Sequence, residues 1–88
     1  MLTSSERLLK LPDGVDLHAR PAAVFTRTAL AHESKITVGA GEKEADAKSL
    51  LSLLALGAKG GSVLRLRAEG KDAEAALDAL GAALDAFK

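Results

Sequence analysis

The sequence has no cysteine, tyrosine or tryptophan, and its only aromatic residues are two phenylalanines. The absence of cysteine excludes disulfides and thiolate metal sites, and it gives no sign of an oxidising compartment. So few aromatic rings argue against stacking platforms for single-stranded nucleic acid and against an aromatic-lined cofactor pocket. Alanine and leucine must therefore build most of the core.

Net charge is also absent, because twelve Lys and Arg balance twelve Asp and Glu. A neutral chain has no overall field that would draw it to nucleic acid or to an anionic membrane. No apolar run approaches the roughly 18 residues of a membrane span, and residues 1–10 lack the apolar stretch of a signal peptide. We expect one cytoplasmic domain over residues 1–88, monomeric, without nucleic-acid binding or membrane insertion.

Hydrophobic patterning predicts seven short elements in the order β-α-β-β-α-β-α. The alternation is clearest over 63–69, where Leu64, Leu66 and Ala68 face one way and Arg65 and Arg67 face the other. The predicted strands cover 6–11, 35–40, 42–46 and 63–69, and the predicted helices cover 19–32, 49–57 and 72–87. Strands that are polar on one face, with helices that need a surface to cover, predict an α+β fold in which three helices pack on one face of a four-stranded antiparallel sheet.

A histidine and an arginine stand at the opening turn of the first predicted helix, in the run LHARPAA at 17–23. A helix N-terminus offers unpaired backbone N–H groups and partial positive charge, which together hold an anion such as a phosphoryl group. The guanidinium of Arg20 can fork onto phosphate oxygens, and a neutral His18 imidazole supplies a nucleophilic nitrogen. On these grounds alone, His18 is as readily a plain polar residue at a helix start as a phosphate acceptor.

The run LHARPAA, placed after a strand and at the start of a helix, resembles the signature of the HPr family of histidine-containing phosphocarriers. A second stretch, DAKSLL at 46–51, resembles the segment around that family's regulatory serine, and the whole resemblance spans residues 6–87. It implies an open-faced β-sandwich. It also implies a stoichiometric carrier that is itself phosphorylated, rather than a turnover enzyme, with no cofactor and no metal.

By that resemblance, His18 takes a phosphoryl group on Nδ1 from Enzyme I of the bacterial sugar phosphotransferase system and passes it to IIA domains of sugar permeases. Phosphoenolpyruvate is the ultimate donor. Arg20 is implied to steady the group, and the backbone N–H groups of Ala19 and Arg20 are implied to receive it. Carriers of a nitrogen-regulatory chain or a dihydroxyacetone-kinase chain share the histidine motif, and a regulatory binding module acting through Ser49 is an alternative of another class.

The helix predicted after Ser49 supplies the other implied sites. Ser49 matches the serine that an HPr kinase/phosphorylase modifies, although a plain N-cap suits the position equally well. Leu53 and Leu56 are expected in the core, which leaves the other leucines of this short helix as an apolar surface patch. The residues implied to contact partner proteins are Ala23, Arg27, Leu50, Leu51 and Leu54.

Asp16 departs from the family pattern, which usually has glycine two residues before the histidine. A carboxylate there would oppose an incoming phosphoryl group and slow the transfer modestly, and a Cβ restricts a loop that glycine leaves free. Alternatively, the carboxylate holds His18 or Arg20 in place by a hydrogen bond or an ion pair. His32, at the end of the first predicted helix, has no accompanying ligand set and is assigned no role.

Overall fold

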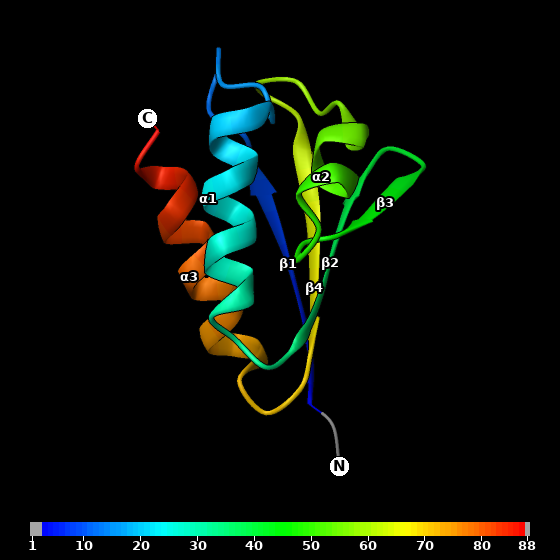
Figure 1. Ribbon diagram of the computed structural model, residues 1–88, viewed down its shortest axis with the longest axis vertical. Helices are drawn as coiled ribbons and strands as arrows, with labels where there is room; N and C mark the ends of the chain where they lie inside the picture. Colours follow the sequence, from blue (N-terminus) through cyan, green and yellow to red (C-terminus); the bar gives the residue numbers. More distant parts are fainter. Residues whose placement is uncertain (1–2, 88) are drawn as a thin grey trace.

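Four strands form one antiparallel sheet in the order β1-β4-β2-β3, in a computed structural model that describes residues 3–87. The strands are β1 (Ser4–Lys10), β2 (Lys35–Ala40), β3 (Lys43–Asp46) and β4 (Val63–Glu69), and the helices are α1 (Ala19–Leu30), α2 (Leu50–Leu56) and α3 (Ala73–Asp85). The three helices lie on one face of the sheet and leave the other face open (Figure 1). The predicted α+β fold and the order of its elements are confirmed.

Strand β4 organises the sheet because it lies between β1 and β2. Its Leu66 pairs with Arg7 of β1 on one side and with Val38 of β2 on the other. Leu66 is buried beneath the helices, whereas its chain neighbours Arg65 and Arg67 point to the open face. Successive side chains of a strand alternate between the two faces of a sheet, so the pattern read from the sequence fixes which face the helices cover.

The core lies between the helices and the covered face of the sheet. Phe25 of α1, Leu53 of α2, Leu66 of β4 and Leu80 of α3 are each at most 1% exposed. Helix α1 packs against α3 and α2, and α3 also contacts β1 and β4. Burial of each large apolar side chain stabilises the fold by about 1.5–3 kcal/mol. The loop at 11–18, hereafter the histidine loop, is held at both ends because Leu11 and Leu17 belong to this core.

Some element boundaries differ from the predicted ones by one or two residues. Strand β1 starts at Ser4 instead of residue 6, because β4 is long enough to pair Ser4 with Glu69 although the serines carry no hydrophobic signal. Helix α1 ends at Leu30 instead of residue 32, before the connection that leads to β2. Gly57, the last residue of the helix predicted over 49–57, ends α2 in the left-handed conformation, with φ of 61°.

Asp72 stands at the N-cap position of α3, but its carboxylate does not cap that helix. Instead it accepts hydrogen bonds from the backbone N–H groups of Glu33 and Ser34, each at 3.0 Å, and from the Ser34 hydroxyl. The hydrogen bond from the Ser34 hydroxyl is the main reason why the pKa of Asp72 is lower than its ordinary value of 3.8. The two backbone hydrogen bonds and the charge of His32 lower it further by smaller amounts. Asp72 therefore ties the connection between α1 and β2 to the start of α3.

Replacement of Asp72 by asparagine should remove a pH-dependent part of the stability. Because its pKa is lower in the folded chain, the carboxylate contributes fully above its unfolded pKa and loses this contribution as pH falls through the folded pKa. We expect the difference in Tm between wild type and Asp72→Asn to be largest near about pH 6 and to narrow below about pH 4. Thermal unfolding followed by circular dichroism measures this, with the exposed Glu33→Gln as control. A difference that stays constant with pH would contradict the expectation.

Candidate functional site

His18 occupies the N-cap position of α1, so the expected histidine lies at the start of the expected helix. Its backbone is extended, with φ of −99° and ψ of −165°, and its carbonyl accepts from the N–H of Ala22 at 2.9 Å. The imidazole makes no capping hydrogen bond and is exposed. The backbone of His18 therefore begins the helix while its ring stays accessible to another molecule.

The opening turn of α1 is arranged to receive negative charge next to this ring. Ala19 and Arg20 are exposed, and the first turn contains no acidic residue. Pro21 fits this turn because its missing N–H would have no partner there. The amides of Ala19 and Arg20 meet no acceptor within residues 3–87, as expected for the first turn of a helix. The first turn that follows His18 therefore carries two backbone N–H groups without acceptors and one exposed arginine.

The loop that carries His18 is held by the loop between α2 and β4. Leu17 is buried and donates its N–H to the carbonyl of Ala58 at 2.8 Å, and Leu11 exchanges hydrogen bonds with Ser62 and Gly61 at 2.8 and 2.9 Å. These bonds join the two ends of the histidine loop to residues more than 40 positions later in the chain. The position of His18 is therefore set by both loops.

Asp16 takes part in this junction and does not contact the side chain of His18 or Arg20. Its Oδ1 accepts from the N–H of Gly60 at 2.7 Å, and its Oδ2 lies 3.8 Å from Nζ of Lys59. Its backbone carbonyl accepts from the N–H of His18 at 2.8 Å. Of the two alternatives for Asp16, a direct hydrogen bond or ion pair from its carboxylate to His18 or Arg20 is not found, because the carboxylate faces the opposite loop.

The leucines of α2 divide largely as expected. Leu53 and Leu56 are buried, at 0% and 7% exposure, and Leu51 is 79% exposed. Leu50 is partly exposed, whereas Leu54 is half-buried and packs against the core. Leu54 therefore adds less to the surface than expected, because a helix of two turns cannot turn three of its leucines fully away from the sheet.

The remaining expected site residues lie on the same two helices. Ala23 is half-buried and Arg27 is exposed on α1, which packs against α2. Ser49 caps α2, with its hydroxyl oxygen accepting from the N–H of Ser52 at 3.3 Å. The predicted N-cap is confirmed. Figure 1 places the start of α1 and the helix α2 at the same end of the molecule.

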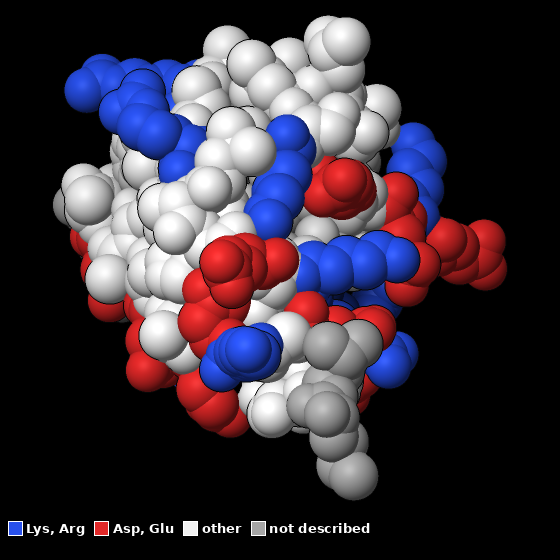
Figure 2. All heavy atoms as spheres, turned by 60° about the horizontal axis from the view of Figure 1, so that its bottom comes forward, with Lys and Arg blue, Asp and Glu red and all other residues white. Residues whose placement is uncertain are grey.

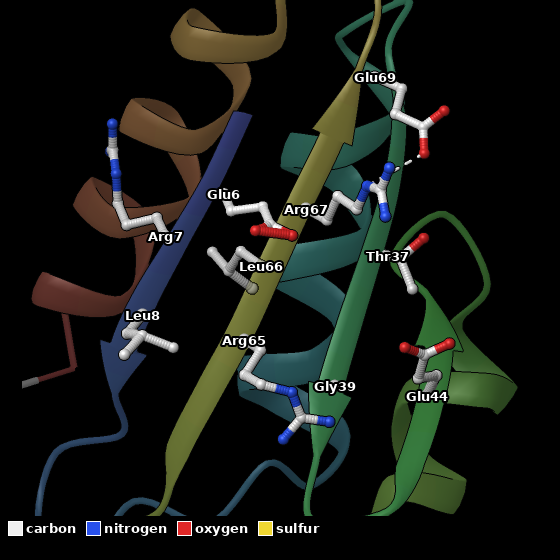
Figure 3. A pocket seen from close by; sticks show the side chains of 10 residues that line it. All are labelled: Glu6, Arg7, Leu8, Thr37, Gly39, Glu44, Arg65, Leu66, Arg67 and Glu69. Carbon is white, nitrogen blue, oxygen red and sulfur yellow. Dashed lines mark ion pairs between the residues drawn. The ribbon is translucent and has the colours of Figure 1, made fainter. Parts of the chain in front are cut away.

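A separate hollow of the described chain lies on the open face of the sheet. It has a volume of about 500 Å³ and is lined by charged side chains of β1, β3 and β4, with Leu8 at its side (Figure 3). Nε of Arg67 lies 3.2 Å from Oε1 of Glu69, and Arg65 extends across Gly39 and donates to the carbonyl of Gly41 at 2.8 Å. Its arginines are already engaged, and its lining has no histidine, so it offers no counterpart to the site at His18.

Charge and metal-binding groups do not point to another function. Within residues 3–87 no three His, Cys, Asp or Glu residues gather closely enough to hold a metal ion. No helix in that part of the chain is both long and apolar enough to cross a membrane. Figure 2 shows Lys and Arg interspersed with Asp and Glu on the face that it presents, without a broad basic area.

Known proteins are similar to this chain in both sequence and fold. A family model described as "PTS HPr component phosphorylation site" matches residues 5–86. The phosphocarrier protein HPr of Mycoplasma capricolum is 39% identical over 70 residues, which cover 80% of this chain and 79% of that protein. The phosphocarrier protein NPr of Shewanella violacea is 40% identical over 85 residues, covering 97% and 93% respectively. The crystal structure of HPr from Thermoanaerobacter tengcongensis matches with a TM-score of 0.87 at 38% identity, over 93% of this chain and 92% of that one.

Proposed function

The chain belongs to the HPr family of phosphocarriers of the phosphotransferase system, and from this premise we propose that His18 accepts a phosphoryl group from phosphorylated Enzyme I. In this proposal the chain passes the group to IIA domains of sugar permeases in the cytoplasm, as a stoichiometric carrier and not a turnover enzyme. The observation that carries the proposal is the exposed imidazole of His18 at a helix start, beside two amides without acceptors.

The proposed transfer uses Nδ1 of His18 as the nucleophile. Its lone pair attacks phosphorus while the bond between phosphorus and Enzyme I breaks, and the bonding electrons leave with Enzyme I. The imidazole proton stays on Nε2. The guanidinium of Arg20 and the amides of Ala19 and Arg20 supply positive charge to the phosphoryl oxygens. Because the site is exposed, the same face remains open to the IIA domain, which attacks phosphorus in the second transfer.

Partner docking is assigned to the surface around this site. The residues proposed to make contact are Ala23 and Arg27 of α1 and Leu50, Leu51 and Leu54 of α2. Ser49 lies at the start of α2, and its phosphorylation by an HPr kinase/phosphorylase would add nearly two negative charges beside the leucines. A helix N-terminus tolerates such charge, so this modification would obstruct docking without unfolding the chain.

Truncation of Leu51 should weaken docking without changing the chemistry. The side chain is 79% exposed, so its loss leaves the core intact. We expect Leu51→Ala to raise the KM for loading by Enzyme I about tenfold at an unchanged kcat, the effect of removing one apolar contact from an interface. Leu30→Ala is the matched control, because Leu30 is 61% exposed near the other end of α1. Equal KM values for both variants would contradict the assignment of this surface.

A carrier of the nitrogen branch is the second candidate, since the relative named NPr matches over 97% of this chain. The decisive experiment incubates the wild-type chain with phosphoenolpyruvate, magnesium and either the sugar-system Enzyme I or its nitrogen-branch homologue. Magnesium here serves Enzyme I. Intact mass under alkaline conditions, which preserve phosphohistidine, should show one added phosphate and faster loading by the sugar-system enzyme. Faster loading by the homologue would favour the nitrogen branch, and no phosphate from either active enzyme would refute the carrier role.

A further inference from the structure

We propose that Asp16 is a positioning residue for the phosphoryl transfer at His18. Its carboxylate fastens the loop between α2 and β4 to the backbone that presents the histidine. The inference rests on the proposed function, because it concerns how fast His18 is loaded. The expected contribution of Asp16 to the rate of loading is opposite in sign to that of simple charge repulsion.

Asp16 makes hydrogen bonds in two directions at once. Its carbonyl receives the N–H of His18 at 2.8 Å, which fixes the chain immediately before the N-cap of α1. Its Oδ1 receives the N–H of Gly60 at 2.7 Å, from a residue 44 positions later in the chain. The next residue, Leu17, is anchored to Ala58 of the same later loop. Without the bond from Asp16 to Gly60, the nearest remaining hydrogen bond between the two loops would be that of Leu17, and the next would lie at Leu11, seven residues before His18.

The contact with Gly60 carries more of this effect than the contact with Lys59. A bond of 2.7 Å between an ionised carboxylate and a backbone amide is short and directional. The ammonium of Lys59 lies 3.8 Å away on a side chain that is 79% exposed, where water and salt weaken an ion pair. Asp16 therefore acts mainly as a hydrogen-bond acceptor for Gly60 and less through its charge.

Repulsion between Asp16 and a phosphoryl group on His18 is the opposing effect. The carboxylate is 45% exposed and faces the backbone of Gly60, with the ammonium of Lys59 nearby. Solvent and these two groups screen its charge from the phosphoryl group. A loosened histidine loop, by contrast, misplaces the attacking nitrogen, and small displacements of a nucleophile reduce rates strongly. Positioning should therefore outweigh repulsion.

The test compares the rates at which Enzyme I loads the wild type, Asp16→Ala and Asp16→Asn. With Asp16→Ala as its substrate, Enzyme I should show a kcat for loading about tenfold lower than with the wild type, and a KM within about twofold. Asp16→Asn should restore kcat to within about threefold, because its amide oxygen can still accept from Gly60. Asp13→Ala is the matched control in the same loop. The Asp13 side chain is 89% exposed, and its ion pair with the Lys10 ammonium is long, at 4.0 Å.

Several outcomes would overturn the inference. Faster or unchanged loading of Asp16→Ala would show that repulsion balances or outweighs positioning. An Asp16→Ala variant with a lower Tm but an unchanged kcat for loading would show a purely structural role. An Asp16→Asn variant that is loaded as slowly as Asp16→Ala would show that the hydrogen bond to Gly60 does not matter for the rate. In each of these cases the wild type still loads, so the proposed function survives. A wild type that accepts no phosphate from active Enzyme I would refute the function, and the inference with it.

Discussion

The variant His18→Ala should accept no phosphate from Enzyme I and phosphoenolpyruvate, while the wild type gains one phosphate per chain. The reason is chemical, because alanine has no nucleophilic nitrogen and nothing else in the first turn of α1 can replace it. Stability should change by less than about 0.5 kcal/mol, since the imidazole is exposed and makes no capping bond. Intact mass under alkaline conditions measures the first effect and thermal unfolding measures the second.

The other histidine provides the control for this experiment. His32 is half-buried near the end of α1, and its Nδ1 lies 3.1 Å from the carbonyl of Thr28. His32→Ala should gain one phosphate at the wild-type rate. Phosphate on His18→Ala, or its absence from His32→Ala with the fold intact, would show that the acceptor has been placed on the wrong histidine.

Local patterns in the sequence were sufficient for the fold and for the place of His18. Alternation in β4 identified its two faces, because side-chain direction in a strand depends only on position along the chain. The run LHARPAA lies where the helix predicted over 19–32 begins, and α1 starts at Ala19 as that range requires. Gly57 ended α2 where its positive φ is needed. Each of these features is decided within a few neighbouring residues.

The contacts of Asp16 and Asp72 could not be predicted in this way. Asp16 binds the backbone of Gly60, and Asp72 binds the backbone of Ser34, across separations of 44 and 38 residues. Every residue except proline has a backbone N–H group, so no pattern in the sequence marks one of them as the partner of a particular carboxylate. Asp72 is the first residue of the helix predicted over 72–87, where aspartate usually serves as an N-cap, a role that depends only on neighbouring residues.

Leu54 shows a limit of a different kind. Helical spacing alone placed it with the exposed leucines, but it packs against the core. Such a short helix exposes only a narrow strip, and the neighbouring helix α1 covers part of the rest. The apolar surface that remains is carried mainly by Leu51, which is why the docking experiment uses that residue.

Substitution of Gly60 by alanine should damage both stability and phosphoryl transfer. A Cβ at this position would lie 2.7 Å from the backbone nitrogen of Gly14, 2.8 Å from that of Val15 and 3.0 Å from the carbonyl of Pro12. Backbone atoms cannot swing aside as the end of a side chain can, so the two loops must separate. We expect the free energy of unfolding to fall by about 1–3 kcal/mol, the usual cost of forcing atoms into a packed region.

The same separation should slow the loading of His18 more than tenfold at saturating Enzyme I, because the loops that fix its backbone no longer meet as they do in the wild type. Denaturant unfolding and loading kinetics on the folded variant measure the two effects separately. Gly81→Ala is the matched control, since a Cβ there would approach only the end of the Leu9 side chain, at 3.7 Å, within helix α3. That variant should load normally and gain up to about 1 kcal/mol, because alanine favours the helix over glycine. Normal loading of a destabilised Gly60→Ala would instead show that His18 works without the support of the second loop.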